Sequence, residues 1–542
     1  MTAGAGTRRM QRRKYSVRCA QLVGLGTLLA LLHSCGGGDN SLTPGGGPPP
    51  FTAVPQVRVS QPTSLVAGCD GVPVSGTLFN GTAIEPSLAQ NPATPSNLIA
   101  TWQQNRWSNG GSQLIGVAAS FDGGNSWSLS SPPVFSRCAG GNSGNAGNYA
   151  RASNAWVSIS PNGVAYALAL AFTGQTFAAG SSSAMLVAQS LNGGANWSLP
   201  LALIQDGAAF FNDKGSITAD PTNSNYVYAV WDRLAGQTAG PTYFSSTANA
   251  NSTWSTAQSI YDPGANNQTI GNVIVVTPDD TLVNLFNEID TAADGTASSH
   301  LKAIVSVNHG STWSTTPVSV ADILAVGTTD PNGGKVRDSA LLFTAAVGPK
   351  GAIYVAWQDA RFSSGAHDGI ALSYSTDDGA TWTKPVQVNA DASVQAFTPT
   401  LNVSAAGVIA VTYYDLRNAM DSTTELLTDC WIVTSTDAVT FTESHLSGPF
   451  DLQLAPDTDE GFFLGDYEAL TNDGAQFEPF YAQTNQGMGV SSDVFFSFPP
   501  NAPATAHFQA RPAPRGAGLT RAARARMSER IRLAQAQRLN RG

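Results

Sequence analysis

The sequence predicts an all-β fold built as an array of one repeated unit. Charged residues make up only 12% of the chain, whereas it holds 54 glycines and 11 tryptophans, a composition typical of β-rich, turn-rich proteins. A nine-residue phrase, Ser-x-Asp/Asn-x-Gly-x-x-Trp-Ser/Thr in outline, also recurs along the chain. Its four clear copies begin at Ser120, Ser190, Ser306 and Ser375.

The spacing of the phrase indicates how many units the chain holds. A worn copy ends at Trp254-Ser255 and another spans residues 435–441. The clear copies and the last worn one are separated by 70, 116, 69 and 60 residues. The step of 116 residues equals two ordinary repeats, with the Trp254 copy between them. A period in this range indicates an array of one supersecondary unit.

The residues of the phrase are typical of a tight turn. Asp or Asn side chains hydrogen-bond the backbone two residues on, and glycine supplies a positive φ. The tryptophan after the turn offers a large apolar face to the core. We therefore expect a structural role for the paired positions, which are Asp122 and Trp127, Asn192 and Trp197, Asn308 and Trp313, and Asp377 and Trp382.

This phrase resembles the Asp-box of the sialidase (neuraminidase) BNR-repeat superfamily. The resemblance implies a β-propeller of four-stranded antiparallel blades. It also implies that the boxes lie on turns between outer strands, away from an active site. Because Asp-boxes also occur in propellers without hydrolytic activity, the resemblance predicts a fold more strongly than an activity.

The strand pattern of each repeat supports this plan. A short strand opens the unit, an apolar strand ending in Trp or Tyr follows, and an alternating strand leads into the box turn and a fourth strand. The second strands are expected at residues 97–102, 226–231, 353–357 and 408–414, among others. They stand inside six repeats that start near residues 86, 151, 213, 268, 338 and 397.

A seventh unit without a box follows at residues 466–470, 477–482 and 493–498, one strand short. We expect residues 57–59 near the N-terminus to supply the missing strand, because closing a ring in this way removes exposed sheet edges. The sequence therefore predicts seven blades, with six as the alternative. Known sialidases have six, so a seventh blade would set this chain apart from them.

The N-terminus reads as a targeting segment. Six Lys and Arg residues within residues 1–18 precede an apolar stretch at residues 19–32, which is too short to span a bilayer comfortably. The stretch ends in Leu32-His33-Ser34-Cys35 and resembles a bacterial lipobox. We expect a signal peptide over residues 1–34, lipidation of Cys35 and a Gly/Pro-rich tether over residues 35–54.

These features predict a lipoprotein of the bacterial outer membrane, with a periplasmic or secreted protein as the alternative. Cysteine use fits an exported chain. Cys69 and Cys138 are expected to form a disulfide in the first repeat region, and Cys430 to be a buried, inert thiol.

The charge is unevenly distributed. Residues 511–542 carry nine arginines and one acid, Glu529, and the part between this tail and the N-terminal segment holds 13 basic and 37 acidic residues. An acidic propeller, expected over residues 55–499, disfavours nucleic acid as a partner. The tail, residues 500–542, is expected to be a disordered solubilising segment, with a basic amphipathic helix on anionic lipid as the alternative.

Candidate functional residues gather on one predicted face. In a propeller, the loops after each second strand share a face with the starts of the first strands, around the mouth of the central channel. Those loops repeat an arginine, at Arg106, Arg233, Arg361 and Arg417. The starts of the first strands add charged residues at Glu85, Arg151, Asp213, Lys214, Asp338 and Asp466.

The resemblance to sialidases implies roles for these residues. Clustered arginines would clamp a sugar carboxylate, a tyrosine activated by a glutamate would attack the anomeric carbon, and a carboxyl group would act as general acid. The ligand-binding candidates are Arg106, Arg233, Arg361 and Arg417. The catalytic candidates are Tyr467 with Glu468, Tyr413 or Tyr414 with Glu288, and Glu85 or Asp359 as the acid.

The same residues have a structural interpretation, which we rank first. The charged phrase recurs in four of the seven predicted blades, as ion pairs between blades would, and no arginine precedes an Ile-Pro as it does in the sialidase Phe/Tyr-Arg-Ile-Pro motif. The sequence thus favours a monomeric propeller that binds a glycan or envelope protein without catalysis. An exo-acting glycosidase and a structural role in envelope assembly are the alternatives.

No cofactor or metal is expected. The six histidines show no metal-ligand spacing. Oxygen-rich Asp/Asn-Gly turns leave calcium as a minor alternative, although none has the spacing of an EF-hand.

Overall fold

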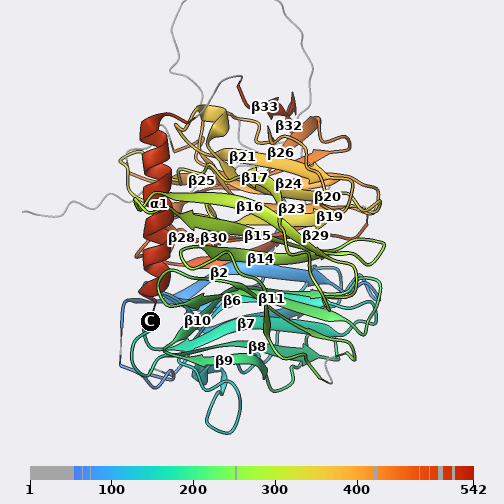
Figure 1. The fold of residues 1–542 in the computed structure, drawn as a ribbon, viewed down its shortest axis with the longest axis vertical. Helices are drawn as coiled ribbons and strands as arrows, with labels where there is room; N and C mark the ends of the chain where they lie inside the picture. The colour runs from blue at the N-terminus through green and yellow to red at the C-terminus, as the bar shows by residue number, and fades with distance from the viewer. Residues whose placement is uncertain are drawn as a thin grey trace, which may run out of the picture. The chain divides into compact units, whose positions relative to one another are not determined.

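The computed structural model describes residues 54–541 except 64, 67, 74, 251–252, 420–423, 475, 488, 499–503 and 515–518. The predicted signal peptide, the lipidated Cys35 and the tether up to residue 53 lie outside the described residues. Within the described part the protein is all-β apart from one α-helix and short 3-10 turns. Figure 1 shows the sheets side by side, with the helix running past their ends.

Most strands form antiparallel meanders, in each of which consecutive strands pair. A separate small sheet pairs β18 (Val336–Arg337) in parallel with β28 (Gly461–Phe463), which pairs with β27 (Asp457–Thr458). Six meanders are consecutive in sequence. They are β2 (Leu78–Gln90), β3 (Leu98–Trp107), β4 (Ser112–Ser120) and β5 (Ser128–Leu129); β6 (Arg151–Ile159), β7 (Ala165–Thr173), β8 (Ser182–Ser190) and β9 (Leu201–Gly207); β10 (Phe210–Ala219), β11 (Val227–Ala235), β12 (Thr242–Thr247) and β13 (Gln258–Tyr261); β14 (Gln268–Val276), β15 (Leu282–Thr291), β16 (Ala297–Ser306) and β17 (Val318–Asp322); β19 (Phe343–Val347), β20 (Ile353–Asp359), β21 (Gly369–Ser375) and β22 (Val386–Gln387); and β23 (Ala396–Val403), β24 (Ile409–Asp415), β25 (Leu427–Ser435) and β26 (Thr440–Asp451).

A last meander joins the two ends of the chain. It holds β29 (Ala469–Asn472), β30 (Phe477–Thr484) and β31 (Ser492–Ser497), and its fourth strand is β1 (Gln56–Arg58). Val57 of β1 pairs with Phe496 of β31 in antiparallel register. The prediction that a strand near residues 57–59 completes this unit is confirmed.

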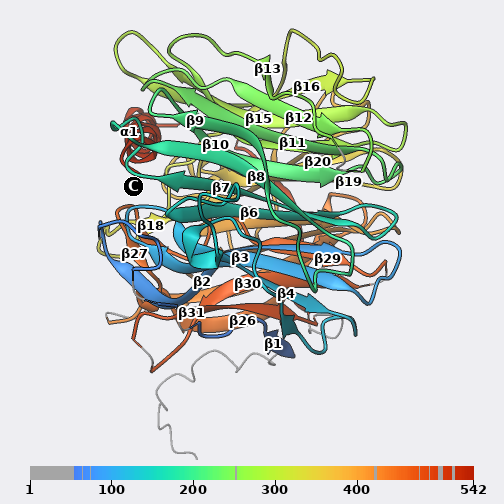
Figure 2. The same ribbon diagram turned by 90° about the horizontal axis from the view of Figure 1, so that it is seen from below.

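Neighbouring meanders stand side by side in Figures 1 and 2. Among the described residues, isolated backbone bridges link some of these neighbours. Ser112 of β4 bridges Ala152 of β6, and Thr82 of β2 bridges Ser492 of β31. Contact between meanders is therefore mainly through side chains. Buried tryptophans at the second-strand ends, Trp102, Trp231 and Trp357, lie in these cores.

The repeated phrase forms the same turn in each copy. In the best-preserved copy, Asp377 accepts hydrogen bonds from the Ser375 hydroxyl (2.7 Å) and the Thr381 amide (2.8 Å), and the Trp382 indole donates to the Gly379 carbonyl (3.0 Å). In the first copy Trp127 packs against Phe480 and Phe496 of the last meander, with ring centroids 6.2 and 5.5 Å apart. The boxes are structural, and this tryptophan packs on the adjacent sheet.

Cys69 and Cys138 form a disulfide, as the sequence predicts. The bond fastens the segment before β2 to the 3-10 turn η1 (Arg137–Ala139). Cys430 is a free thiol and is buried in β25. Burial raises the pKa of this thiol well above its ordinary value, which keeps it protonated and inert.

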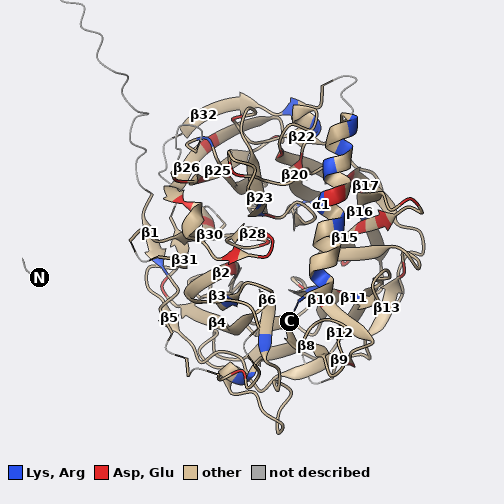
Figure 3. Ribbon diagram, turned by 90° about the vertical axis from the view of Figure 1, so that its left-hand side faces the viewer, with Lys and Arg blue, Asp and Glu red and all other residues tan. Residues whose placement is uncertain are grey.

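The tail is folded, so the expectation of a disordered segment is wrong for its described residues. Strand β32 (Ala504–Gln509) pairs with the outer strand β26, and β33 (Arg511–Pro512) pairs with the outer strand β22. Helix α1 (Arg521–Leu539) follows and lies across one end of the sheets (Figure 3). Within the described residues no helix is long and apolar enough to cross a membrane.

Candidate functional site

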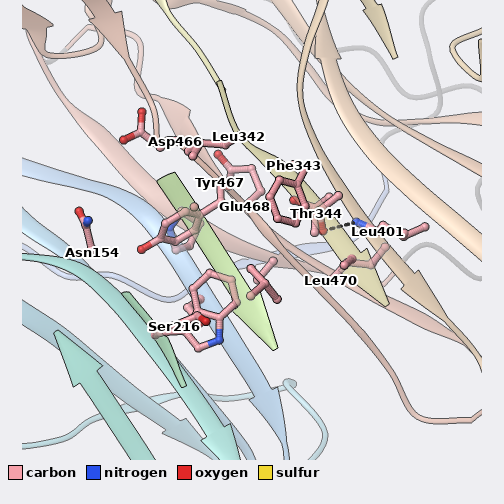
Figure 4. Close-up of a pocket in the computed structure, with 18 of the residues that line it drawn as sticks. Asn154, Ser216, Leu342, Phe343, Thr344, Leu401, Asp466, Tyr467, Glu468 and Leu470 are labelled. Atoms are coloured by element: carbon pink, nitrogen blue, oxygen red, sulfur yellow. Dashed lines mark hydrogen bonds between the residues drawn. The ribbon is translucent and has the colours of Figure 1, made fainter. Parts of the chain in front are cut away.

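A cavity of about 200 Å³ lies where the first strands of the meanders meet (Figure 4). Its lining residues come from β2, β6, β10, β14, β19, β23 and β29 and from the segment just before β29. Trp156, Leu342 and Phe343 contribute apolar surface, while Asn154 and Lys214 contribute polar groups. The cavity therefore has a mixed apolar and polar lining, and we call it the channel.

Strand register defines the end of the channel that carries the charged residues. Asp213 at the start of β10 pairs with Asp232 near the end of β11, and Ala396 of β23 pairs with Asp415 at the end of β24. Starts of first strands and ends of second strands therefore lie at one end, as predicted. We call this end the mouth, and Figure 3 views it from outside.

Five first strands carry a β-bulge near the mouth. Register shifts interrupt the pairing of β2, β6, β10, β14 and β23 with their neighbours. At each shift one residue adopts a left-handed conformation, with φ between 41° and 70°. These residues are Glu85, Asn154, Lys214, Gly271 and Thr398. Only one is glycine, although each other residue type is strained in this region.

Two bulge residues, Glu85 and Lys214, lie in a cluster of five charged side chains. Lys214 contacts Glu85 at 3.2 Å and also pairs with Asp466, while Arg337 of β18 (Val336–Arg337) binds Asp466 at 2.6 Å and Glu460 at 3.0 Å. All but Glu460 are at least nine-tenths buried. Burial raises the pKa of Glu85 despite the attraction of Lys214. Burial would also raise the pKa of Asp466, but Arg337 and Lys214 lower it well below its ordinary value.

Tyr467 and Glu468 do not form a nucleophile pair. The Tyr467 hydroxyl donates to the Ala155 carbonyl at 2.9 Å, and a Glu468 oxygen accepts from the Ala482 amide at 2.9 Å. Burial, with the nearby Glu85 and Asp466 carboxylates, raises the pKa of Tyr467 well above its ordinary value. A phenol held protonated in this way is a poor nucleophile.

The alternative tyrosine pairing is also absent from the described contacts. Tyr413 is hydrogen-bonded to Glu443, and Tyr414 donates to the Ala482 carbonyl at 2.6 Å. Glu288 instead accepts from Tyr261 and Lys302, both at 2.6 Å. The structure therefore does not bring Glu288 to either tyrosine.

The four predicted clamp arginines each have their own partner. Arg106 is buried and donates to Gln103 at 2.6 Å, while Arg233 pairs with Asp206, also at 2.6 Å. Burial lowers the pKa of Arg106 to about 9. Arg361 pairs with Asp359 at 2.8 Å, and Arg417 bridges Asp415 and Glu443. No carboxylate-sized point is shared among their described contacts, and Asp359 serves as the partner of Arg361.

Carboxylates dominate the part of the mouth beneath α1. Asp213 and Asp232 are fully buried, and both bind Arg538 of the helix. Asp213 also binds Arg541. Burial alone would raise the pKa of Asp213, but Arg541, Arg538 and Lys214 lower it well below its ordinary value. Asp213 is thus charged, and both aspartates take cations from the C-terminal segment.

A second acidic group lies farther along α1. Asp338 accepts from Arg530 at 2.7 Å and from the Gln358 amide at 3.1 Å. Asp368 is fully buried and accepts from the Val326 and Gly327 amides at 2.8 and 2.9 Å. Burial, strengthened by the Asp338 charge, raises the pKa of Asp368 to about 7.

The described residues hold no group of three or more His, Cys, Asp or Glu side chains arranged to bind a metal ion. The carboxylates of the mouth instead contact arginine, lysine and backbone amides. One buried oxygen each of Glu85, Asp232 and Glu468 has no hydrogen-bond partner among the described residues. The arrangement can therefore hold cationic groups, and it offers an anionic sugar neither a free arginine clamp nor an activated nucleophile.

Sequence reasoning identified the residue types at the mouth but missed the bulges and the role of the tail. The bulges leave a faint trace in the sequence, since Asn154 and Gly271 are residue types that tolerate positive φ. The inward arginines of α1 were visible only as part of a basic tail.

Comparison with known proteins gives a family match over part of the chain. Residues 242–448 match the BNR repeat-like domain. No curated protein sequence matches the chain significantly.

Similar solved structures include glycoside hydrolases. The α-L-arabinanase of Penicillium chrysogenum is 13% identical, with 83% of this chain and 100% of that chain covered and a TM-score of 0.45. A Hadza microbial sialidase is 15% identical, with 75% and 78% covered and a TM-score of 0.44. The Trypanosoma rangeli sialidase is 10% identical, with 83% and 57% covered and a TM-score of 0.42.

The raised pKa of Asp368 predicts a pH-dependent effect of Asp368→Asn. With a folded pKa near 7 against an ordinary 3.8, the folded state keeps a proton that the unfolded state releases between these values. The contribution of Asp368 to the free energy of unfolding of the wild type therefore falls as pH rises through this window, by at most about 1.4 kcal/mol per pH unit. We expect the variant to gain stability relative to the wild type between pH 5 and pH 7.5, measured by urea unfolding.

The Asn side chain cannot accept from both the Val326 and the Gly327 amide. We therefore expect an additional loss in the free energy of unfolding that is the same at every pH. A difference between variant and wild type that is the same at both pH values would contradict the assignment.

Proposed function

We propose that the protein is a lipid-anchored seven-bladed β-propeller of the bacterial cell envelope that binds a glycan or protein ligand at its mouth without hydrolysing it. The blade number is supported by the cavity, whose lining draws on the first strand of seven meanders. The N- and C-terminal pairing of β1 with β31 supports ring closure.

The bulges at the mouth carry the proposal of a binding site. Non-glycine residues in the left-handed region cost about 1–2 kcal/mol each, and such strain persists mainly where a structure holds side chains for a purpose. Here four non-glycine residues, Glu85, Asn154, Lys214 and Thr398, take this conformation at equivalent bulges. Asn154 and Lys214 line the cavity. The strain thus supports a site built around these side chains.

Binding without hydrolysis is supported by how the predicted catalytic groups are engaged. Each clamp arginine is paired with its own acceptor, and the Tyr467 hydroxyl is bonded to a backbone carbonyl. An activated nucleophile needs a base within hydrogen-bond reach, and the described contacts give Tyr467 none. A catalytic site would need these contacts to be rearranged.

Two substitutions at equivalent bulges should differ in their effect on stability. Asn154→Gly removes the side chain and relieves the left-handed strain, so we expect the free energy of unfolding to stay within about 1 kcal/mol of the wild type. Gly271→Asn adds the strain at the equivalent bulge and presses a side chain onto Leu342, so we expect a loss of about 1–3 kcal/mol. Urea unfolding measures both. A large loss for Asn154→Gly would show that Asn154 serves stability rather than binding.

A fluorogenic sialic-acid conjugate tests catalysis. We expect no release of the fluorophore above the uncatalysed rate, either by the full-length protein or by its Tyr467→Phe variant. The same full-length sample on a printed glycan array distinguishes glycan from protein ligands. Release by the wild type that Tyr467→Phe abolishes would establish a hydrolase and overturn the proposal.

Lipid anchoring rests on the lipobox-like segment around Cys35. We expect Cys35→Ser to move the protein from the membrane fraction to the soluble fraction and to abolish incorporation of radiolabelled palmitate. Cys430→Ser, which changes a buried thiol of the propeller, is the control that should leave both unchanged. Membrane association that survives Cys35→Ser would contradict a lipid anchor at this residue.

A further inference from the structure

The inner face of helix α1 is an arginine-bearing surface matched to the acidic mouth. Arg530 binds Asp338 at 2.7 Å and the Val336 carbonyl at 3.2 Å. Arg538 binds Asp213 at 3.0 Å and Gln268 at 3.2 Å, and it also pairs with Asp232. Just beyond the helix, Arg541 pairs with Asp213. Three aspartates of the mouth thus take their cations from this one segment.

An apolar ridge runs between these arginines. Ala523, Met527 and Ile531 recur at every fourth residue, which places them on one side of a helix. Together with Leu519 they form a buried cluster that includes Leu342 and Ile289 of the propeller. The Ser528 hydroxyl accepts from the Ala297 amide at 2.9 Å. Apolar, hydrogen-bond and ionic contacts therefore fix one register of the helix on the mouth.

The outer face of α1 differs sharply from the inner face. Arg521, Arg524 and Arg532 are exposed, and Arg532 pairs only with Glu529 of the same helix. Figure 3 shows basic residues spaced along the helix, with the mouth behind it. Arg526 is also exposed but donates to the Gly365 carbonyl. Arg530 and Arg538 therefore bind the mouth, whereas Arg521 and Arg524 are exposed and serve as matched controls.

The mouth without α1 would present carboxylates with no cation. Asp213, Asp232 and Asp338 have side chains that are fully buried beneath the segment. Removing one partner of a buried charge pair leaves an uncompensated charge at high cost. The vacant mouth thus favours a ligand that restores guanidinium groups at these points. An anionic ligand would meet the same carboxylates unfavourably.

We propose that the mouth is a receptor for an arginine-bearing helical segment of a partner protein, and that α1 is its intramolecular occupant. The inference rests on the proposed function, because it takes the mouth as the recognition face. Partner binding and seating of α1 are then mutually exclusive. A partner must supply the same pattern of two or three arginines beside an apolar ridge, and guanidinium is required because its planar fork matches carboxylates bidentately.

The pairing of β32 and β33 keeps α1 close to the mouth when it is displaced. These strands hold the segment before α1 on the outer edges of two sheets. A segment tethered in this way competes at an effective concentration on the order of millimolar. The full-length protein should therefore not bind a free peptide with the sequence of α1. Substitutions that weaken the binding of α1 to the mouth should allow this peptide to bind.

The test uses full-length protein and a fluorescent peptide of residues 519–541, with binding measured by anisotropy. We expect no binding to the wild-type chain and clear binding to a full-length chain carrying Arg530→Ala and Arg538→Ala. The matched control chain carries Arg521→Ala and Arg524→Ala, which change only exposed arginines, and should exclude the peptide as the wild type does.

Peptide variants test the chemistry of the partner on the receptive chain. A peptide with Arg530→Ala and Arg538→Ala should bind at least about thirtyfold more weakly, the lower range for truncating buried charge pairs. Peptides with Arg521→Ala and Arg524→Ala should bind like the unchanged one. An unrelated helical peptide with arginines at the same spacing should bind, and its lysine version should bind more weakly. Equal binding of all peptides, or none to the receptive chain, would overturn the proposal.

A chain that carries a protease site within residues 515–518 provides a second route if the receptive variant is unstable. After cleavage, α1 should exchange with the labelled peptide, with the same discrimination among variants. Light scattering could instead show dimers in which two copies of the chain exchange α1. Such exchange without peptide binding would contradict the proposal that the mouth binds a separate partner protein. Hydrolysis of a sialoside would contradict the proposed function, whereas failure of the peptide to bind would contradict only the receptor proposal. The two outcomes are therefore distinguishable.

Discussion

A carboxylate that is removed from water needs a cation, and this constraint governs the mouth of the protein. Asp213, Asp338 and Asp466 are almost fully buried where the first strands begin. Lys214 and Arg337 of the propeller satisfy Asp466, whereas Asp213 and Asp338 take their arginines from the C-terminal segment. The fold of the mouth therefore depends on residues from the very end of the chain, and the tail is part of the folded body.

The repeated turns solve a different problem, which is how separate sheets are held side by side. Backbone bridges between meanders are few, so cohesion comes from side chains. The Trp127 ring on Phe480 and Phe496, and the Trp313 ring 5.5 Å from Phe244, show box tryptophans packed on the preceding sheet. In two copies the indole also donates to the turn itself, from Trp127 to the Gly124 carbonyl and from Trp382 to the Gly379 carbonyl, which fixes the direction of the ring. The Trp313 indole has no such partner among the described residues, and its ring is held by packing.

Most of the fold could be predicted from the sequence because it depends on local patterns. The box residues, the apolar second strands and the short last unit each have a recognisable composition, and the pairing of β1 with β31 followed from the one missing strand. The disulfide followed from the small number of cysteines in a chain that was predicted to be exported. These features are decided by residue type and spacing, which a sequence displays directly.

The candidate site was less predictable, because partner choice is decided in three dimensions. Arg361 and Arg417 were placed correctly near the ends of second strands. Each, however, forms an ion pair with a carboxylate only two residues away, Asp359 or Asp415. Arg538 meets Asp213 across 325 residues of sequence. No local pattern distinguishes Arg538 from the exposed Arg532, since both belong to the same basic, alanine-rich stretch.

The pairing of β1 with β31 has a consequence for how the protein is made. Gln56 meets Ser497, so the last sheet contains strands from both ends of the body. A chain emerging from its N-terminus can finish the intervening sheets in order, yet it must keep β1 unpaired until residue 497 has arrived. Contacts of such long sequence separation form slowly. During synthesis, β1 therefore keeps an unpaired edge, and the last sheet is completed only when nearly the whole polypeptide has been made.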